Sequence, residues 1–450
     1  MAQWNIPVPA PVSAVLDRLE RAGFEAYAVG GCTRDALLGQ APDDWDITTS
    51  ALPEQTKEVF SDCRTIDTGI KHGTVAVRME DMLLEVTTYR VDGDYKDSRH
   101  PEDVTFTRSL AEDLARRDFT MNAIAYSPVR GPVDLYGGAE DIAARTIRCV
   151  GDPETRFTED ALRILRALRF SSVLGFSIEP ETAAAIHARK ERIRYVAMER
   201  IATELLKLLC GKDVCRVLLE YRDVLAVVLP ELGPCFDFDQ KNPNHIYDVY
   251  THIAKSVEAV EPEPRLRLAM LLHDIGKPET FFTDEAGVGH FYGHAKAGVR
   301  LAEDILRRLK LPAQMQEDVR TLVEYHDYPL EARKPVLLRR LNKFGEQGLR
   351  DLIAVQRADG LAQAPDLAGP RLDRLRTIES ELDRLLPERP AYRTADLAVR
   401  GKDLIDLGIE PGPGLGALLQ ELLEKVMAGE LTNDRDALLA YAEGRNTKPV

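Results

Sequence analysis

The chain has 450 residues, enough for about two to four domains with sizeable cores. Apolar residues make up 44% and charged residues 30%, which is typical of a globular protein and excludes a disordered one. The formal net charge of −15 argues against a general nucleic-acid coat protein, which is normally basic. Residues 141–216 nevertheless carry 14 Lys and Arg against 11 Asp and Glu, so one local basic segment remains for nucleic acid.

The sequence predicts a protein that works in the cytoplasm and not in a membrane. It has no run of about 18 apolar residues, and its N-terminus lacks the basic and apolar segments of a secretory signal. The six cysteines form no C-x-x-C pair, which excludes a zinc ribbon and a dithiol redox motif. Few cysteines in a long chain without a signal favour a reducing compartment.

Helical and strand-like patterns alternate over the first 140 residues. PVSAVLDRLERAGF predicts a helix, EAYAVGG a short strand that leads into a glycine turn, and GTVAVRMEDMLLEVTTYR a hairpin that turns at Glu80 and Asp81. The polar segment VDGDYKDSRHPEDV predicts a loop. From Asp160 to about Gly360 the pattern is almost wholly helical, and after Pro390 a turn precedes an amphipathic helix.

Two aspartates flank a tryptophan in the segment DDWDIT. In a strand, Asp44 and Asp46 lie on the same face, and Glu85 in LLEVTT can add a third carboxylate from a neighbouring strand. Mg²⁺ prefers such carboxylates together with substrate phosphates. Upstream, Gly30-Gly31 allows close approach of a phosphate, whose charge Arg34 can neutralise. The alternative is that D-x-D is an ordinary acidic turn.

These residues are part of a longer series of motifs. VGG-x-x-RD-x-LLG precedes DWDI, and TGIKHGTV, EVTTYR and LARRDFTMNAIA follow it. The series resembles the class II nucleotidyltransferases, and more narrowly the bacterial CCA-adding tRNA nucleotidyltransferases and their poly(A) polymerase relatives. The resemblance implies an α+β fold, in which a polymerase-β-like head is followed by an all-helical neck, body and tail. It also implies template-independent addition of C, C and A to tRNA 3′ ends from CTP and ATP.

The resemblance also implies roles for individual head residues. Asp44 and Asp46 would hold two Mg²⁺, and Glu85 would be the third acidic residue. Two metals can activate a 3′-hydroxyl and stabilise the pyrophosphate leaving group. Phosphoryl transfer further requires positioning and charge neutralisation, which arginines supply. The residues expected to contact the triphosphate and sugar are Gly31, Arg34 and Arg117. For the arginines of RRDFTMNA the alternative is a structural salt bridge.

The segment TEDALRILRALRF predicts a helix with Thr158 as its N-cap. Asp160 and Arg163 would then be neighbours at i and i+3. A carboxylate beside a guanidinium matches the amino donor and ring acceptor of cytosine and adenine, whereas guanine and uracil reverse that order. The resembled family selects bases with an E-D-x-x-R motif, here Glu159, Asp160 and Arg163, with Arg166 and Arg169 assisting. The alternative is a solvated basic helix face.

The motif HDIGK and several spaced histidines resemble the HD phosphohydrolase superfamily, in which His, His-Asp and a later Asp bind a divalent metal. The implied ligands are His252, His273, Asp274 and Asp359. His294 and His326 would bind a second metal or contact the substrate. Imidazole with carboxylate suits Mn, Fe, Ni or Zn. The alternatives are that HD is only a packing feature and that His290 belongs to a surface loop.

The resulting organisation is a head at residues 1–140, a neck for nucleotide selection and tRNA binding at 141–235, an HD-type body at 240–362 and a tRNA-binding tail at 363–450.

The leading hypothesis is CCA addition, with HD phosphohydrolase activity as an open addition. The alternatives are a poly(A) polymerase, an enzyme that adds only A, a principal HD phosphohydrolase and a non-catalytic tRNA-binding protein. Enzymes that add only CC lack the long RVDGDYKDSRHPEDVTF segment, so its presence favours A addition. The expected partners are the tRNA 3′ end, CTP and ATP, and the sequence leaves the oligomeric state open.

Overall fold

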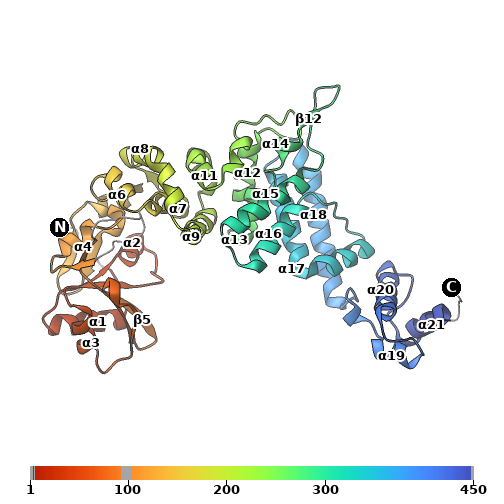
Figure 1. The fold of residues 1–450 in the computed structure, drawn as a ribbon, viewed down its shortest axis with the longest axis horizontal. Coiled ribbons are helices and arrows are strands. Elements are labelled where there is room, and N and C mark those ends of the chain that lie inside the picture. Colours follow the sequence, from red (N-terminus) through yellow and green to blue (C-terminus); the bar gives the residue numbers. More distant parts are fainter. Residues whose placement is uncertain (1–3, 5, 93–103, 447–450) are drawn as a thin grey trace. The chain divides into compact units, whose positions relative to one another are not determined.

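The computed structural model describes residue 4, residues 6–92 and residues 104–446. The chain forms two compact units, one of residues 1–233 with 308–310 and the other of residues 234–307 with 311–450. Figure 1 shows the order of their elements along the chain. The α+β fold class is confirmed, whereas the finer division into four domains stays a prediction.

A seven-stranded sheet forms the framework of the first unit, with strand order β3-β4-β5-β2-β1-β8-β9. β2 and β5 run parallel, and all other neighbouring strands are antiparallel. The predicted hairpin is confirmed as β4 and β5, which meet at Met79 and Met82. The strands are β1 Ala26–Val29, β2 Asp46–Thr49, β3 Thr65–Gly69, β4 Thr74–Met79, β5 Met82–Thr88, β8 Ile124–Ser127 and β9 Gly131–Asp134.

Helix α1 (Ala10–Arg21) covers part of this sheet because its apolar side chains recur at helical spacing. Val12, Val15, Leu16 and Leu19 are fully buried and share one core with sheet residues such as Ile47. The predicted helix at this position is therefore confirmed. The other helices around the sheet are α2 Gly31–Leu37, α3 Pro53–Val59, α4 Leu110–Ala115 and α5 Gly138–Ala143.

Part of the predicted loop VDGDYKDSRHPEDV is paired strand. β6 (Arg90–Asp92) and β7 (Val104–Phe106) are antiparallel, with Val91 opposite Thr105. Residues 93–103, which make up the rest of that loop, lie outside the described residues. The argument for A addition rests on this segment and stays a prediction.

The rest of the first unit is mostly helical, but the predicted start of its central helix is wrong. The chain forms two helices here, and Thr158 lies inside the first, where its hydroxyl donates to Glu154 O at 2.8 Å. Asp152 is the N-cap of that helix, through a 2.9 Å bond from Thr155 N to Oδ2. The helices are α6 Pro153–Glu159, α7 Leu162–Leu174, α8 Pro180–Arg189, α9 Met198–Leu209, α10 Val214–Glu220 and α11 Arg222–Val228. The short strand β11 Ser177–Ile178, which pairs with β10 Thr146–Ile147, also interrupts the predicted helical pattern.

The second unit is helical apart from one short hairpin. Helix α17 bends at Gly345, whose φ of 70° favours glycine. Its first half shares an apolar core with α18 and the C-terminal helices, including Leu341, Leu375 and Leu422. The elements are α12 Val249–Ala259, α13 Pro264–Leu272, α14 Lys277–Thr280, β12 Phe282–Thr283, β13 Gly289–His290, α15 His294–Arg308, α16 Ala313–Tyr325, α17 Lys334–Leu361, α18 Pro365–Leu385, α19 Gly401–Asp406, α20 Pro413–Ala428 and α21 Arg435–Asn446.

Six short 3₁₀ helices complete the described elements: η1 Ile70–His72, η2 Thr120–Asn122, η3 Lys190–Tyr195, η4 Pro230–Cys235, η5 Leu386–Glu388 and η6 Thr394–Asp396. Among the helices of the described residues, none combines the length and the apolar character that crossing a membrane requires.

Candidate functional site

The three predicted head carboxylates gather on two adjacent strands. Asp46 begins β2 and stands directly opposite Glu85 of β5 in the parallel register, while Asp44 lies two residues before it. Trp45 between the two aspartates is buried, so the carboxylates share the exposed face. The pKa of Asp46 is raised, first because the surrounding protein removes water from its carboxylate and then because Glu85 and Asp44 repel a further negative charge.

This arrangement fits a hard divalent cation. All three side chains offer oxygen ligands, and a cation between them removes the repulsion that raises the pKa of Asp46. The ligand atoms of the three carboxylates are nevertheless less tightly gathered than those of a closed metal site. In the described part of the chain, groups of three potential ligands within 4.8 Å of one another occur only in the second unit.

Arg117 lies beside these carboxylates and next to Gly30. A Cβ atom on Gly30 would lie 3.4 Å from Arg117 Nη1 and 3.9 Å from Asp46 Oδ2. Burial lowers the pKa of Arg117, an effect that the charge of Asp113 opposes. Asp113 binds both Arg117 (3.4 Å) and Arg116 (2.8 Å), so the structural salt bridge expected as an alternative exists in addition to the position beside Asp46.

Arg34 lies beside the second glycine of the pair. A Cβ atom on Gly31 would lie 3.6 Å from Arg34 Nη2. The Arg34 guanidinium donates to Asn122 Oδ1 at 2.9 Å, and its Nη2 is 2.8 Å from Asp35. The structure therefore brings Gly31, Arg34 and Arg117 to the turn between β1 and α2, as predicted from the motif.

Arg166 and Arg169 of α7 do not form a freely solvated basic stripe. Arg166 binds Asp118 at 2.7 Å, and Arg169 binds Glu204 of α9 at 2.9 Å and stacks on Phe170. Burial alone would raise the pKa of Asp118, but the charge of Arg166 and several hydrogen bonds lower it to about 2. Helix α9 therefore holds α7 through charge pairs as well as through apolar packing.

The pairing of Asp160 with Arg163 on one helix face is wrong. Asp160 lies between α6 and α7 with extended backbone angles, and its Oδ1 accepts from Leu162 N at 3.0 Å. Its Oδ2 binds Arg200 of α9 at 3.1 Å. The Arg163 guanidinium is buried, binds Glu159 at 2.7 Å and donates to Arg116 O at 3.0 Å. The structure therefore gives the two side chains separate partners.

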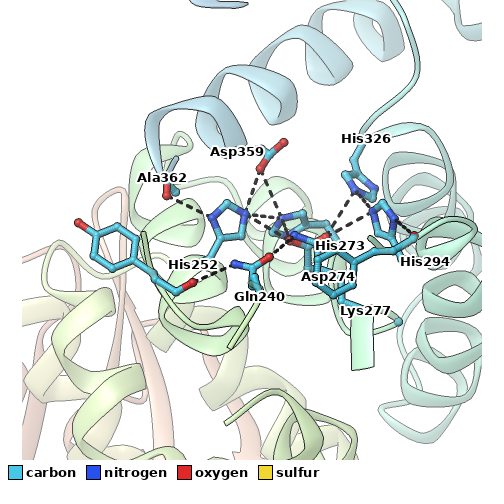
Figure 2. Close-up of polar contacts among 12 residues, drawn as sticks. Gln240, His252, His273, Asp274, Lys277, His294, His326, Asp359 and Ala362 are labelled. Atoms are coloured by element: carbon cyan, nitrogen blue, oxygen red, sulfur yellow. Dashed lines mark hydrogen bonds and ion pairs between the residues drawn. The ribbon is translucent and has the colours of Figure 1, made fainter. Parts of the chain in front are cut away.

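The six residues predicted for the body form one cluster, here called the His/Asp cluster: His252, His273, Asp274, His294, His326 and Asp359. They come from separate helices or helix ends of the second unit, and Figure 2 shows them facing one another. Two groups of three have ligand atoms within 4.8 Å, namely His252 with His273 and Asp274, and Asp274 with His294 and His326. Asp274 belongs to both groups. Asp359 is joined to the first group by a 3.0 Å contact between its Oδ1 and His252 Nε2.

The ring nitrogens of His294 and His326 show that this cluster suits a metal. Each Nδ1 lies within hydrogen-bond distance of a carbonyl three residues earlier, at 2.9 Å from Phe291 O and 2.7 Å from Val323 O. Burial lowers the pKa of both rings, and because a carbonyl oxygen only accepts, each Nδ1 is the donor. The two Nε2 atoms face each other across 3.0 Å. A cation between them can bind both Nε2 atoms. A metal-bound histidine usually donates its other ring N–H to a backbone carbonyl or a carboxylate, as each Nδ1 does here to a carbonyl.

Close backbone packing brings His294 next to Asp274. Gly276 of HDIGK has no space for a side chain, because a Cβ atom would lie 2.3 Å from His294 O and 2.5 Å from Gly298 N. The start of α15 therefore lies directly against the turn that carries Asp274. The resulting distance from His294 Nε2 to Asp274 Oδ1 is 3.5 Å.

Four further polar side chains around the cluster were not foreseen. Lys277 Nζ lies 2.7 Å from Asp274 Oδ2 and donates to Gln240 at 2.9 Å, and Arg371 lies 2.7 Å from Asp359. The ring of His245 packs edge-on against His252, and burial is the main cause that lowers its pKa to about 3. The quoted HDIGK motif contains Lys277, whereas the other three have no local signal.

His290 lies outside both groups of three, but it belongs to a strand and not to the surface loop that was the expected alternative. Its Nε2 is 2.8 Å from Asp284, and it is part of β13. A cavity of about 340 Å³ opens beside the His/Asp cluster. Its lining combines cluster residues with the newly found polar groups and with aromatic rings: Asn242, His245, Asp274, Lys277, His290, Phe291, Tyr292, Gly293, His294, His326, Asp327, Asp359, Gln363 and Arg371.

Comparisons with known proteins match both units. Family models match at residues 26–148 (Poly A polymerase head domain), 175–235 (probable RNA and SrmB-binding site of polymerase A) and 291–442 (tRNA nucleotidyltransferase domain 2, putative). The CCA-adding enzyme of Levilactobacillus brevis is 37% identical over 426 residues, which cover 95% of each chain. That of Enterococcus faecalis is 34% identical and covers 96% of this chain and 95% of the relative.

Solved structures agree with this result. The Bacillus stearothermophilus CCA-adding enzyme in complex with CTP superposes with a TM-score of 0.75, at 32% identity and with 98% of each chain covered. The Thermotoga maritima CCA-adding enzyme complexed with tRNA has a TM-score of 0.59 and covers 96% of this chain and 94% of that one. At 18% identity, this second match supports the fold alone.

Proposed function

The chain belongs to the family of CCA-adding enzymes, and we propose that it adds C, C and A to tRNA 3′ ends from CTP and ATP without a nucleic-acid template. The observation that carries this function is the placement of Asp46 opposite Glu85, with Asp44 and Arg117 beside them. Transfer forms a bond between the tRNA 3′-oxygen and the α-phosphorus, breaks the bond to pyrophosphate and releases the hydroxyl proton. Because tRNA and nucleoside triphosphates are cytoplasmic, we place the enzyme there.

Nucleotidyl transfer in this family uses a divalent metal, and we assign Mg²⁺ to Asp44, Asp46 and Glu85. When bound, Mg²⁺ would lower the pKa of the 3′-hydroxyl and neutralise the triphosphate. Arg117 and Arg34 hold the triphosphate and sugar beside the Gly30-Gly31 turn, and the missing side chains at that turn let the backbone approach phosphate. Their fixed partners keep both guanidinium groups in place before the nucleotide arrives.

Base selection is assigned to Asp160 first. Its carboxylate is held by Leu162 N and Arg200, so it is pre-oriented to accept from the amino group of cytosine or adenine and to repel a carbonyl oxygen. Arg163 can donate to the adjacent ring nitrogen only by exchanging its bond with Glu159 for one with the base. This exchange is part of the proposal. Arg166 and Arg169 hold α7 through Asp118 and Glu204 and act on the nucleotide through that position.

A single assay separates this function from its alternatives. The purified protein is incubated with tRNA that lacks CCA, ends in C or ends in CC, with each nucleoside triphosphate in turn. We expect CTP to extend the first two and ATP only the third, by one residue. Extension of the CC-ended tRNA alone would assign A addition only, and long tails from ATP would assign a poly(A) polymerase. No extension would favour a non-catalytic tRNA-binding protein.

A second function is proposed for the His/Asp cluster, carried by the two groups of three potential ligands and by the facing Nε2 atoms of His294 and His326. We assign one transition-metal ion, Mn, Fe, Ni or Zn, to His252, His273, Asp274 and Asp359, and a second to Asp274, His294 and His326. When bound, such ions would lower the pKa of a water molecule, so that it could lose a proton near neutral pH and attack phosphorus. In the proposed hydrolysis a water oxygen bonds to phosphorus, one P–O ester bond breaks, and the leaving oxygen takes a proton. Lys277 and Arg371 orient the two carboxylates.

A further inference from the structure

The aromatic ring of Phe170 gathers three arginine side chains of the first unit. The guanidinium carbon of Arg169 lies 4.0 Å from the ring centroid, that of Arg34 5.1 Å and that of Arg166 5.5 Å. All three lie within the range of about 6 Å over which a ring face attracts a cation. Phe170 is buried, and the ring of Phe119 packs edge-on against it, with the two centroids 5.9 Å apart. The ring therefore has a fixed position before a nucleotide binds.

The contact between Phe170 and Arg34 joins two distant segments of the chain. Arg34 belongs to α2, whereas Phe170 belongs to α7 together with Arg166. A polar chain joins the same two helices. Arg34 donates to Asn122 Oδ1 at 2.9 Å, Asn122 donates to Asp118 Oδ1 at 3.1 Å, and Asp118 Oδ2 accepts from Arg166 at 2.8 Å. Two routes thus connect Arg34 with α7, a polar one and an aromatic one.

An aromatic ring can hold these cations without neutralising them. Burial is the main cause that lowers the pKa of Arg169; the charge of Glu204 opposes it, and the charges of Arg166 and Arg34 add to it. Each arginine already has a carboxylate neighbour, and a further carboxylate would compete with a phosphate for the guanidinium. A ring face attracts the cation through its quadrupole and leaves the positive charge and the N–H donors in place. Phe170 thus suits a site where arginines must be gathered and still bind an anion.

We propose that Phe170 is a positioning residue for the nucleotide, whose ring ties Arg34, at the triphosphate, to α7, the helix assigned to base selection. This inference rests on the nucleotide-binding roles proposed above and adds a residue that has no charge and no hydrogen-bonding group in its side chain. Arg34 lies beside Gly31, where the triphosphate is assigned. A weaker attraction by the ring should therefore weaken nucleotide binding and leave the chemical step nearly unchanged. CTP and ATP should be affected equally, because they carry the same triphosphate.

The test weakens the attraction for cations without removing the ring. Phe170 is replaced in the full-length protein by mono-, di- and trifluorinated phenylalanine, because each fluorine withdraws electrons from the ring face and changes its shape little. KM and kcat are measured for CTP with tRNA that lacks CCA and for ATP with CC-ended tRNA. We expect KM for both nucleotides to rise with each fluorine, to about 3- to 30-fold for the trifluorinated ring. The value of kcat and the melting temperature should stay nearly constant.

The same three replacements at Phe60 are the matched control. Phe60 is fully buried, and Arg18 stacks on its ring at 4.7 Å, but neither residue belongs to the nucleotide site. KM should not change in this series. Phe170→Leu, which keeps an apolar side chain but has no ring face, should raise KM at least as much as trifluorination does. A constant KM along the Phe170 series, or an equal rise along the Phe60 series, overturns the inference.

Calorimetric titration with CTP and Mg²⁺ in the absence of tRNA separates this inference from the proposed catalysis. If the protein extends no tRNA but its affinity for CTP falls stepwise along the Phe170 series, only the proposed CCA addition fails. Normal addition with the same affinity for CTP throughout the series contradicts the role of Phe170 alone. A wild type that neither binds CTP nor extends tRNA refutes both.

Discussion

Asp46 and Glu85 stand directly opposite each other across the only parallel strand pair of the seven-stranded sheet, with their side chains on one face. Like charges that stand directly opposite each other on neighbouring strands destabilise a sheet unless a cation lies between them. The raised pKa of Asp46 reflects part of this cost. The cation site that we propose lies at this point, where β2 begins.

Asp46→Ala and Asp44→Ala should each abolish nucleotide addition while tRNA binding persists. Loss of a carboxylate that holds the metal removes transition-state stabilisation, and we expect a fall in kcat of about 100- to 1,000-fold or more. Single-turnover addition of CTP and a separate tRNA-binding assay measure the two effects. Asp43→Ala is the matched control, since it removes a neighbouring exposed carboxylate that does not belong to the group of Asp44, Asp46 and Glu85. Wild-type turnover in either active-site variant contradicts the metal assignment.

Asp160→Ala should lose base discrimination as well as rate. The carboxylate attracts the correct amino group and repels a carbonyl oxygen, each worth about 1–3 kcal/mol, so UTP and GTP should gain relative to CTP and ATP. Ratios of kcat/KM for CTP:UTP and ATP:GTP measure this. Asp152→Ala, which removes the cap of α6, controls for a loss of helix stability and should leave both ratios unchanged. A uniform fall in rate for all four nucleotides would show that Asp160 only supports the fold.

The number of bound metal ions should reveal that the two proposed metal sites share Asp274. The wild type, purified with its native ions, should hold two transition-metal ions per chain, His294→Ala one, and His273→Ala combined with Asp274→Ala none. Phosphatase activity should disappear with the double substitution, and CCA addition should remain. Elemental analysis gives the counts, with His187→Ala as a control because its ring instead pairs with Asp223. A wild type without bound metal refutes the assignment.

Gly276→Ala should selectively disturb the second metal site. The added methyl group would meet backbone atoms of His294 and Gly298 and must push the start of α15 away from Asp274. We expect loss of about one metal ion per chain and a lower melting temperature. Gly414→Ala is the control, because a Cβ atom at Gly414 meets no atom within 4 Å. Retention of both ions with an unchanged melting temperature contradicts the close approach.

Asp118 should make the first unit sensitive to acid. Its pKa of about 2 lies below the value of about 3.9 for an unfolded chain, so its contribution of about 2 kcal/mol is complete above pH 4. The contribution is lost as the pH falls from about 4 to 2. Asp118→Asn should therefore lower the melting temperature by about 4–8 °C at pH 7, and less below pH 4. Calorimetry of the full chain measures this, with the exposed turn variant Asp81→Asn as a control. A difference that is constant with pH excludes the ion pair with Arg166 as the cause.

The sequence predicted those parts of the structure that depend on local spacing. The two-residue period placed Asp44 and Asp46 on one face, and the pattern around Glu80 located the β4–β5 hairpin. The histidines of the His/Asp cluster were singled out because their motif carries a known chemistry, and their role as metal ligands stays a prediction. At Thr158, however, helix α6 has already begun after its cap Asp152, and Asp160 lies in the break before α7, where its carboxylate accepts from Leu162 N.

Partners from distant segments were not predictable in the same way. Gln240, His245 and Arg371 contact the His/Asp cluster or its immediate partners only after helices far apart in the chain have packed. None of them lies in a pattern that differs from an ordinary surface residue. The same holds for Glu159 and Arg200, whose pairing with Arg163 and Asp160 depends on the break between α6 and α7 and on the position of α9.

The strand order of the sheet also determines when the active site can form during synthesis. β2 leaves the ribosome early, but its parallel partner β5 follows only after β3 and β4, and β8 and β9 are later still. The carboxylates of Asp46 and Glu85 therefore remain apart in the growing chain until residue 88 and beyond have emerged. Such non-local pairing is a slow step of folding. A nascent chain can thus form α1 and β1 while it is still unable to capture a nucleotide or a metal ion at this site.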